Sequence, residues 1–329
     1  MKLHSKDLSG ISVLVTGGAG FIGSHITGYL LENGAKHVTV LDDLSTGFEK
    51  NISGFTAQKN FRFVNGSITD LAVCREACKG ADVVLHHAAL GSVPRSIENP
   101  VRTNEVNVSG FVNVLFAAKE CGVKKVVYAS SSSVYGDDDT FPKTESKTGN
   151  LLSPYAVSKR TNEEYAKVFA RLYEMEVTGL RYFNVFGERQ TPDGPYAAVI
   201  PRFIDAVLHN KQASIFGTGN NTRDFTYVAN VIRANLLCIE NSVPKGIVMN
   251  IACGGTISVN DIYNNIAKTL GSGLKPNYLP ERPGEIKNSY ADITLATNTI
   301  GYKPVVTLEE GLQRTVKWFQ NHVKSGNIA

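Results

Sequence analysis

Short apolar runs alternate with longer amphipathic stretches along the first half of the chain. Four runs have the length and β-branched character of buried strands, and each ends at Gly, Asp or Ala: residues 11–17 (ISVLVTG), 37–43 (HVTVLDD), 61–66 (FRFVNG) and 81–89 (ADVVLHHAA). Residues 21–35 and 99–122 have helical patterns, and KKVVYAS at 124–130 is a fifth strand candidate. Strands that alternate with helices predict an α/β fold with a doubly wound parallel sheet.

The second half of the chain has a less regular pattern. Ser153 followed by Pro154 is an N-cap and first-turn pair that predicts the start of a helix, and Thr307 with Glu310 forms a capping box before the last helix. Loops rich in Gly and Pro near 191–195, 217–222 and 276–284 indicate a second, smaller lobe. We expect one domain of residues 1–183 with about 226–252, and a smaller α/β domain of residues 184–225 and 253–329.

The composition is that of a soluble globular protein. The 329 residues are 42% hydrophobic and 19% charged, and the net charge of +4 is scattered, which argues against nucleic-acid binding and suits an anionic small ligand. No apolar run approaches the roughly 20 residues of a membrane span, and the start has no apolar secretory segment. Five cysteines without a paired framework favour the reducing cytoplasm. Cys74 and Cys78, one helical turn apart, are expected to be packed thiols, with a redox or metal site as the alternative.

Three glycines follow the first strand at intervals of three residues. Gly17, Gly20 and Gly23 form G-x-x-G-x-x-G, with Phe21 and Ile22 opening the next helix. Glycines at such a turn allow a pyrophosphate to approach closely, and the N–H groups of the helix N-terminus bind it. Turns collect glycine for other reasons too, but a position between a strand and a helix favours a dinucleotide site.

Two carboxylates end the second strand. Asp42 lies 19 residues after Gly23, where a carboxylate accepts hydrogen bonds from the ribose hydroxyls of adenosine, and Asp43 follows it. A 2′-phosphate about 4 Å away would be repelled by roughly 1–4 kcal/mol, so the pattern favours NAD over NADP. The alternative is an Asp that merely ends a strand.

Four serines, Ser130 to Ser133, end the fifth strand in ASSSSVYG. A linker does not explain serines that terminate a strand, so we expect these hydroxyls to line a site. Further along, Tyr155 and Lys159 in SPYAVSK stand at i and i+4 of the predicted helix, on one face. Beside a dinucleotide site, this Tyr and Lys form a candidate catalytic pair.

These motifs resemble those of the extended short-chain dehydrogenase/reductases, and more narrowly those of the UDP-sugar 4-epimerases. The resemblance covers essentially the whole chain and rests on the glycine loop, Asp42, HHAALGSVPRS, ASSSSVYGD, SPYAVSK, LRYFNVFG, TRDFTYV and RPGE. AALGSVPRS and PYAAVIP are similar to segments of the branch that acts on UDP-N-acetylhexosamines. The resemblance implies a Rossmann-like first domain that binds NAD, a second domain that binds the UDP-sugar, and a homodimer paired through two helices per subunit.

The resemblance also implies a mechanism and a set of cofactor contacts. Tyr155, its pKa lowered by Lys159 and the charged nicotinamide, removes the 4-hydroxyl proton while NAD takes the C4 hydride, and Ser131 hydrogen-bonds the reacting oxygen. The 4-keto intermediate then turns over and the hydride returns to its opposite face. Besides the glycine loop, the expected cofactor residues are Asp42, Asp43, Ser67, Ile68, His87, Ala88, Ala89, Asn107, Tyr155, Lys159 and Tyr182. Asn107 has a satisfied core amide as its alternative, and Ser67 replaces an Asp that is usual in the family, which weakens the expectation of tight NAD retention.

Within this superfamily, the positions of Ser131, Ser132 and Ser133 separate reaction types. The related 4,6-dehydratases carry Asp and Glu at the second and third positions, and the UDP-glucuronate decarboxylases keep a Glu at the third. A serine hydroxyl holds a sugar hydroxyl but is no ready acid or base near pH 7. Hydroxyls alone therefore favour C4 epimerisation, which requires no further proton shuttle.

The implied substrate contacts are Ser132, Ser133, Asn184, Ala198, Val199, Arg223, Arg282, Glu285 and Ser289. Ser289 stands where enzymes restricted to glucose and galactose have a bulky Tyr, which leaves room for a 2-acetamido group and favours the pair UDP-N-acetylglucosamine and UDP-N-acetylgalactosamine. The alternatives are the UDP-glucose pair, a uronate substrate, a dehydratase or decarboxylase, and a non-catalytic NAD-binding protein. No metal-ligand pattern is present in the sequence.

Overall fold

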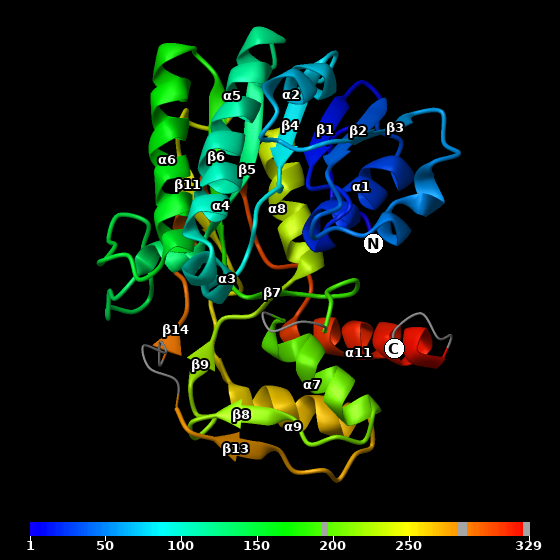
Figure 1. Cartoon of the computed structure of the whole chain (residues 1–329), viewed down its shortest axis with the longest axis vertical. Coiled ribbons are helices and arrows are strands. Elements are labelled where there is room, and N and C mark those ends of the chain that lie inside the picture. Colours follow the sequence, from blue (N-terminus) through cyan, green and yellow to red (C-terminus); the bar gives the residue numbers. More distant parts are fainter. Residues whose placement is uncertain (193–196, 282–287, 325–329) are drawn as a thin grey trace.

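A computed structural model describes residues 1–192, 197–281 and 288–324. Its centre is a seven-stranded sheet in the order β11-β6-β5-β4-β1-β2-β3, in which all neighbouring strands are parallel (Figure 1). The strands are β1 (Ser12–Thr16), β2 (His37–Asp42), β3 (Phe61–Asn65), β4 (Val83–His86), β5 (Lys125–Ser131), β6 (Glu176–Tyr182) and β11 (Val248–Ile251). The five strands expected in the first half are thus confirmed, and the fold is the predicted doubly wound α/β fold.

Helices cover both faces of this sheet (Figure 1). On one face α1 (Phe21–Glu32) packs against α8 (Val228–Glu240), and on the other α2 (Leu71–Cys78), α5 (Gly110–Glu120) and α6 (Pro154–Leu172) lie together. Side chains alternate along each strand, so Val13 and Val15 join the core on the α1 side and Leu14 joins the core on the α5 side. The inner strands β1 and β4 are buried throughout because both faces of the sheet are covered, whereas the edge strand β3 is only partly buried.

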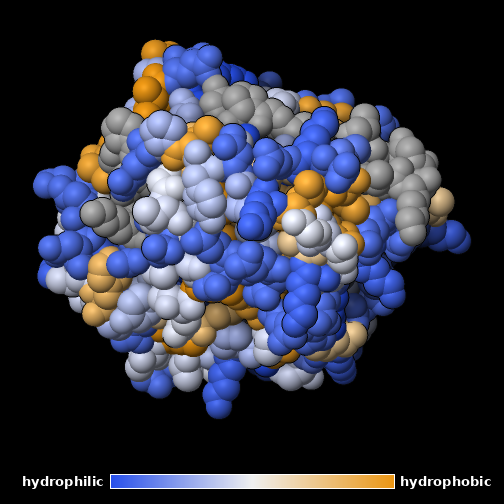
Figure 2. All heavy atoms as spheres, turned by 90° about the horizontal axis from the view of Figure 1, so that it is seen from below, coloured by the Kyte–Doolittle hydropathy of each residue, from blue (hydrophilic) through white to orange (hydrophobic). Residues whose placement is uncertain are grey.

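A smaller group of elements lies at the bottom of Figure 1. It contains short sheets in the orders β12-β9-β14 and β13-β8, and a β10-β7 pair joins it to the larger part. The elements are β7 (Val185–Phe186), β8 (Ser214–Phe216), β9 (Thr222–Arg223), β10 (Thr226–Tyr227), β12 (Ile257–Ser258), β13 (Asn277–Leu279), β14 (Asn288–Ser289), α7 (Val199–Leu208), α9 (Val259–Thr269), α10 (Thr294–Ile300) and α11 (Leu308–Lys324). Hydrophilic residues predominate on this end of the molecule, with small separate hydrophobic patches (Figure 2). The residue boundaries of the two domains remain predictions.

Both predicted helix starts are confirmed. The Ser153 hydroxyl accepts a hydrogen bond from the Ala156 N–H (3.2 Å) ahead of α6, and the Thr307 hydroxyl accepts one from the Glu310 N–H (3.2 Å) at the start of α11. No helix within the described residues is long and apolar enough to cross a membrane.

The helix expected over residues 99–122 differs from the prediction. It is divided into α4 (Pro100–Asn104), a π-helical turn η3 (Glu105–Ser109) and α5, while α3 (Val93–Glu98) precedes it. The π turn adds a residue to the helical repeat beside the loop after β4, where Asn107 of the turn hydrogen-bonds the Leu90 backbone. Three short 3₁₀ turns complete the elements: η1 (Glu49–Asn51), η2 (Ser53–Phe55) and η4 (Ser132–Tyr135).

Candidate active site

A cavity of about 610 Å³ lies at the carboxyl ends of β1, β2, β4 and β5. Loops at these ends face one crevice in a parallel sheet, which is where ligands bind in folds of this class. The lining includes most of the predicted cofactor residues: Gly17, Gly20, Phe21, Ile22, Gly23, Asp42, Asp43, Ile68, His87, Ala88, Ala89, Tyr155, Lys159 and Tyr182.

The glycine loop is closed tightly against its surroundings. Gly17 has φ +69°, and a Cβ at this position would lie 2.6 Å from the Ala88 nitrogen. A Cβ on Gly23 would lie 2.1 Å from the Gly17 carbonyl oxygen, so the first turn of α1 packs directly on the loop. Helix α1 begins at Gly20 without a side-chain cap and without an acidic residue in its first turn. The N–H groups of this turn therefore form an anion site bordering the cavity.

Asp42 is buried at the end of β2 and organises the loops around it. Its carboxylate accepts hydrogen bonds from the N–H groups of Ala19 (2.9 Å) and Leu44 (2.9 Å). Burial raises the pKa of Asp42, and these N–H donors oppose the shift. The same carboxylate thus lines the cavity and joins the glycine loop to the segment after β2.

The two histidines after β4 have different surroundings. His86 is buried against the hydroxyl of Thr16 (2.9 Å from Nδ1) and away from the cavity lining. His87 lines the cavity, and its Nε2 lies 3.1 Å from the hydroxyl of Tyr182, on which its ring stacks. Burial lowers the pKa of His87 to about 4, so its imidazole is neutral at pH 7. A neutral ring fits the wall of a pocket for a cationic nicotinamide.

Tyr155 and Lys159 meet the end of β5 at the start of α6. The Lys159 ammonium donates a hydrogen bond to the Ala129 carbonyl (2.7 Å), and its Nζ lies 5.8 Å from the centre of the Tyr155 ring. The Ser131 hydroxyl accepts a hydrogen bond from the Ser133 N–H (3.1 Å) and acts to lower the pKa of the Tyr155 phenol, which lines the same cavity. Burial lowers the pKa of Lys159 to about 8, and the nearby Glu163 carboxylate opposes this shift.

The pKa of Tyr155 departs from our expectation. In the chain by itself, burial raises this pKa, and the Ser131 hydrogen bond opposes the rise without overcoming it. The expected lowering by Lys159 is not among the influences on this pKa, which are burial and the Ser131 hydroxyl. Burial therefore keeps the pKa of Lys159 below that of Tyr155, and a cationic ligand in the cavity would lower the pKa of Tyr155.

A second cavity of about 400 Å³ adjoins the first. Ala197 lines both, and the second is lined by the predicted substrate residues Asn184, Val199 and Arg223. Ala198, the residue before α7, stands between Ala197 and Val199. Arg202 and Lys211 add positive charge to this lining, which suits a pyrophosphate.

Ser289 is held next to this second cavity by strand pairing. It is the register partner of Arg223 in the β14–β9 pair, and its carbonyl accepts a hydrogen bond from the Asp224 N–H (2.8 Å). The Asn184 amide donates to the Asp224 carbonyl (2.9 Å). Three predicted substrate residues from distant segments, Asn184, Arg223 and Ser289, are thereby brought together around Asp224. Arg282 and Glu285 lie outside the described residues.

Several predicted residues do not line either cavity. The side chain of Asn107 is buried, and it exchanges hydrogen bonds with the Leu90 backbone (2.7 and 3.1 Å) and donates to Ser158 (3.2 Å). It therefore positions the loop after β4, as the alternative interpretation had it, while the neighbouring Val106 lines the cavity. Ser67 bonds Thr69 and lies between the lining residues Gly66 and Ile68. Ser132 and Ser133 lie outside both linings, and the Ser133 hydroxyl is buried without a partner.

Other lining residues escaped our prediction. Ser92 and Arg95, from the loop and helix after β4, line the first cavity together with Ser45, Thr46 and Thr191. The positive φ of Ser92 (+96°) was not recognisable from GSVPRS, although that segment contributed to the resemblance. Among the described residues, no group of three or more His, Cys, Asp or Glu side chains is arranged to hold a metal ion.

Comparison with known proteins agrees with this geometry. Residues 13–252 match the model of the NAD dependent epimerase/dehydratase family. A putative UDP-glucose 4-epimerase of Methanocaldococcus jannaschii is 42% identical over 312 residues, which are 94% of this chain and 99% of that protein. The UDP-N-acetylglucosamine 4-epimerase of Methanobrevibacter ruminantium, solved with UDP-N-acetylmuramic acid, is 40% identical with a TM-score of 0.90 over 95% of this chain and 99% of that one. The UDP-glucose 4-epimerase of Thermotoga maritima, solved with UDP-glucose, is 37% identical with a TM-score of 0.89 over 95% and 100% of the two chains.

Proposed function

The chain belongs to the NAD dependent epimerase/dehydratase family and is an NAD-dependent UDP-sugar 4-epimerase, and within that class we propose that it interconverts UDP-N-acetylglucosamine and UDP-N-acetylgalactosamine. The observation that carries the reaction type is the end of β5. There Ser131 lines the cavity together with Tyr155 and acts to lower its pKa. The Asp side chains of the same lining, Asp42 and Asp43, are at the end of β2, three strands away in the sheet.

The first cavity fits NAD. At Gly17 and Gly23 a Cβ would collide with the backbone, so only glycine allows this tight loop. The start of α1 has no side-chain cap and provides N–H donors for a pyrophosphate, and Asp42 lines the cavity at the end of β2, where we expect the adenosine ribose. We propose that the lining residues from Gly17 to Tyr182 named above hold this cofactor. NAD, when bound, supplies the hydride acceptor and donor for C4 of the sugar.

The protein's own residues manage the proton. Tyr155 as phenolate accepts the proton of the sugar 4-hydroxyl and later returns it to the oxygen on the other face of the sugar. The buried ammonium of Lys159 stabilises the phenolate, and the Ser131 hydroxyl donates a hydrogen bond to the oxygen at C4. Because a 4-epimerase has no elimination or decarboxylation to catalyse, the absence of acids at Ser132 and Ser133 is consistent with this assignment and argues against a dehydratase.

The second cavity supports the substrate assignment. Arg223, Arg202 and Lys211 provide positive charge for the diphosphate, and Asn184 of this lining is next in sequence to Val185 of the first. Ser289, paired with Arg223, carries a small side chain at the position that we expect to face the 2-substituent of the sugar. The UDP-glucose pair is the second candidate, because a small residue at this position also admits the smaller sugar.

Two further features of the protein belong to this proposal. Exposed apolar side chains on α4 and α6, among them Val101, Val157, Val168 and Leu172, support the expected homodimer through two helices of each subunit. All five cysteines are free thiols, which supports the expected cytoplasmic location.

The decisive test is direct. The purified protein is incubated with UDP-N-acetylglucosamine, with and without added NAD, and the anomeric protons are followed by NMR. We expect UDP-N-acetylgalactosamine to appear until equilibrium is reached. Turnover of UDP-glucose alone would refute the substrate assignment and the role of Ser289. Turnover of a UDP-hexuronate alone would also refute the assignment and would identify the uronic sugars as the substrates.

A further inference from the structure

A buried ion pair lies directly behind the catalytic residues and has no part in the mechanism above. Glu163, on α6, is fully buried, and Arg181, on β6, is 2% exposed. Arg181 donates to both oxygens of the Glu163 carboxylate, at 2.9 Å from Nε and 2.8 Å from Nη2. A buried pair of this kind costs several kcal/mol of desolvation for each ion, so two apolar residues would serve the core as well or better. Stability alone therefore does not explain the pair.

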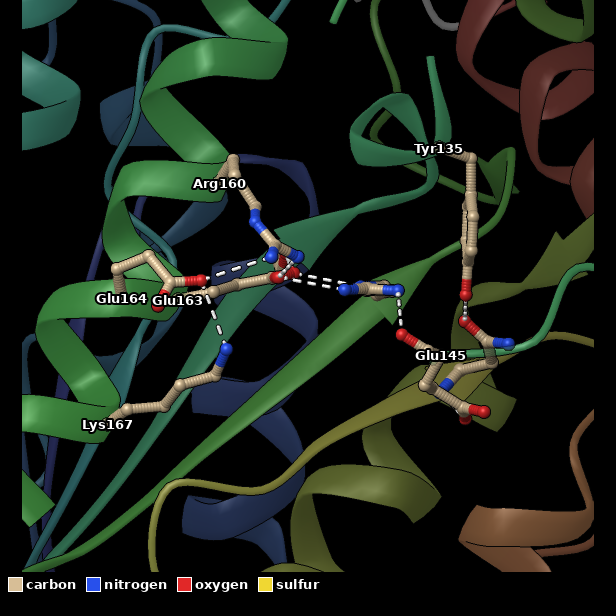
Figure 3. Close-up of polar contacts among 9 residues, drawn as sticks. Tyr135, Glu145, Arg160, Glu163, Glu164 and Lys167 are labelled. Atoms are coloured by element: carbon tan, nitrogen blue, oxygen red, sulfur yellow. Dashed lines mark hydrogen bonds and ion pairs between the residues drawn. The ribbon is translucent and has the colours of Figure 1, made fainter. Parts of the chain in front are cut away.

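The pair is connected to both ends of the serine run. On the N-terminal side, the Ser130 hydroxyl donates a short hydrogen bond to the Glu163 carboxylate (2.6 Å). On the C-terminal side, the Tyr135 ring lies over the Arg181 guanidinium (4.9 Å), and its hydroxyl donates to the Asn250 amide oxygen (2.6 Å) (Figure 3). The residues that flank Ser131, Ser132 and Ser133 in the sequence, Ser130 and Tyr135, thus both contact the Glu163–Arg181 ion pair.

Helix α6 and strand β5 are fastened together at successive turns of the helix. Lys159 donates to the Ala129 carbonyl (2.7 Å) and Glu163 accepts from Ser130 (2.6 Å), while Ser131 acts on the pKa of Tyr155 from the next position of the strand. Three consecutive residues of β5 are therefore matched to three helical positions spaced four apart, all on one face of α6. Loss of the third contact leaves the strand end free to shift or rotate where Ser131 must meet Tyr155.

Glu163 also governs the charge around Lys159. The groups near the Lys159 ammonium are Tyr155 and Glu163 from its own helix, His86 at the end of β4, and His87 directly after it. Burial holds both imidazoles neutral. Glu163 is the neighbour that favours the charged form of Lys159. It therefore supports the ammonium on which the phenolate of Tyr155 depends.

We propose that Glu163, held in place by Arg181, is a positioning residue for the epimerisation: through its hydrogen bond to Ser130 it sets the neighbouring Ser131 hydroxyl against Tyr155. This inference rests on the proposed function. It predicts that losing the contact slows the proton-transfer step while the UDP-sugar, which Glu163 does not touch, binds as before.

The first experiment compares Glu163→Gln with Glu164→Gln. Both substitutions remove one carboxylate from α6, but Glu164 is exposed and pairs with Lys167 (3.0 Å) and with Arg160 (3.2 Å), which also reaches Glu163 at 3.4 Å (Figure 3). We expect Glu163→Gln to lower kcat about tenfold or more with KM for the UDP-sugar within twofold of wild type, and Glu164→Gln to change neither. The acid limb of the kcat profile should move to higher pH in Glu163→Gln alone. Equal effects of the two variants, or a rise in KM with kcat unchanged, would overturn the proposal.

The second experiment covers the case in which Glu163→Gln does not fold. Ser130→Ala keeps the ion pair and removes only the hydroxyl that joins it to the serine run. We expect about a fivefold loss of kcat with unchanged KM, the value of one hydrogen bond. A wild-type kcat in Ser130→Ala would overturn the link to Ser131.

A third measurement separates this inference from the proposed function. Ionisation of Tyr155 is followed by phenolate absorbance in the NAD-loaded protein, as the difference between each variant and the same variant carrying Tyr155→Phe. The Tyr155 pKa should rise in Ser130→Ala and stay at its wild-type position in Glu164→Gln. If the wild-type protein turns over no UDP-sugar, the proposed function fails, and this titration still decides the inference: a Tyr155 pKa unchanged in Ser130→Ala overturns it.

Discussion

Replacing Gly23 by Ala tests the cofactor site through a single methyl group. An ideal Cβ at Gly23 would lie 2.1 Å from the Gly17 carbonyl oxygen, 2.8 Å from the Gly17 carbonyl carbon and 2.9 Å from the Gly18 Cα. All three are backbone atoms, and ordinary contact begins at 3.4 Å, so the loop must retreat by 3.4 − 2.1, about 1.3 Å. Since Gly17 also donates to the Leu41 carbonyl (2.8 Å), the loop cannot retreat without disturbing β2.

The expected loss is larger for NAD binding than for folding. Overpacking costs about 1–3 kcal/mol, but Ala gains up to about 1 kcal/mol over Gly inside a helix, so the net destabilisation is modest. A displacement of this size breaks hydrogen bonds from loop N–H groups to a pyrophosphate, each worth about 1.5–3 kcal/mol. One lost bond therefore raises the Kd for NAD about tenfold to a hundredfold.

The assay is a titration of the cofactor-free protein with NAD, beside a thermal melt, with Gly28→Ala as the matched control. Gly28 lies in the same helix, and a Cβ there meets only the tip of the Phe55 ring, at 3.0 Å, which can move aside. We expect Gly28→Ala to bind NAD as wild type does. A folded Gly23→Ala protein with the wild-type Kd would show that this loop does not carry the pyrophosphate.

Three other perturbations test the chemistry, the size of the sugar pocket and the buried titratable groups. Tyr155→Phe should cut turnover by orders of magnitude while NAD content stays unchanged, and a near-normal rate would remove Tyr155 from the mechanism. Ser289→Tyr should slow UDP-N-acetylglucosamine about tenfold or more relative to UDP-glucose, because the added ring overpacks the pocket, and equal losses on both sugars would discredit Ser289 as the size gate. The free energy of unfolding should fall on acidification. The pKa of His87 in the folded protein is about 4, below its ordinary value near 6.5, so between these values the unfolded chain binds a proton that the folded protein does not. At pH 5 such a His lowers the free energy of unfolding by about 2 kcal/mol, and Asp224, whose pKa is raised to about 6, offsets about 1 kcal/mol of this loss. Urea unfolding of wild type and His87→Leu at pH 7 and pH 5 checks this, and an equal loss in both proteins would contradict it.

The sheet was predictable because its local signals agree with one another. The strands β1, β2 and β4 are buried along almost their whole length, so each reads as a mainly apolar run bounded by Gly, Asp or Ala. Ser153 with Pro154 marks α6 by its capping chemistry alone. Asp42 shows how far such local signals reach. Its place at the end of β2 was predictable, but not that its carboxylate also ties Ala19 to Leu44, because those N–H groups meet it only after the loops close.

The helix at residues 99–122 could not be predicted in detail. A π turn and an α turn have nearly the same pattern of apolar residues over one repeat, so nothing in EVNVS distinguishes them. The extra residue nevertheless rotates the rest of the helix, and Val106 reaches the cavity where Asn107 was expected. The Asn107 amide instead forms hydrogen bonds with the Leu90 backbone and the Ser158 hydroxyl, which come close to it only after the loop following β4 has folded.

The serine run shows why chemistry was easier to predict than placement. That four hydroxyls and no acid end β5 is a property of composition, and it excludes the reactions that require an Asp or Glu there. Which serine does what depends on strand alternation and on the 3₁₀ turn that begins at Ser132, and these turn Ser130 into the core and Ser131 toward Tyr155. The role of Glu163 was equally unpredictable, because a Glu within KRTNEE has the pattern of an exposed helical residue. Its burial depends on the charge of Arg181, which lies 18 positions later on strand β6. The roles of Ser130, Ser131 and Glu163 thus depend on polar contacts between segments distant in the sequence, and only the folded structure reveals these contacts.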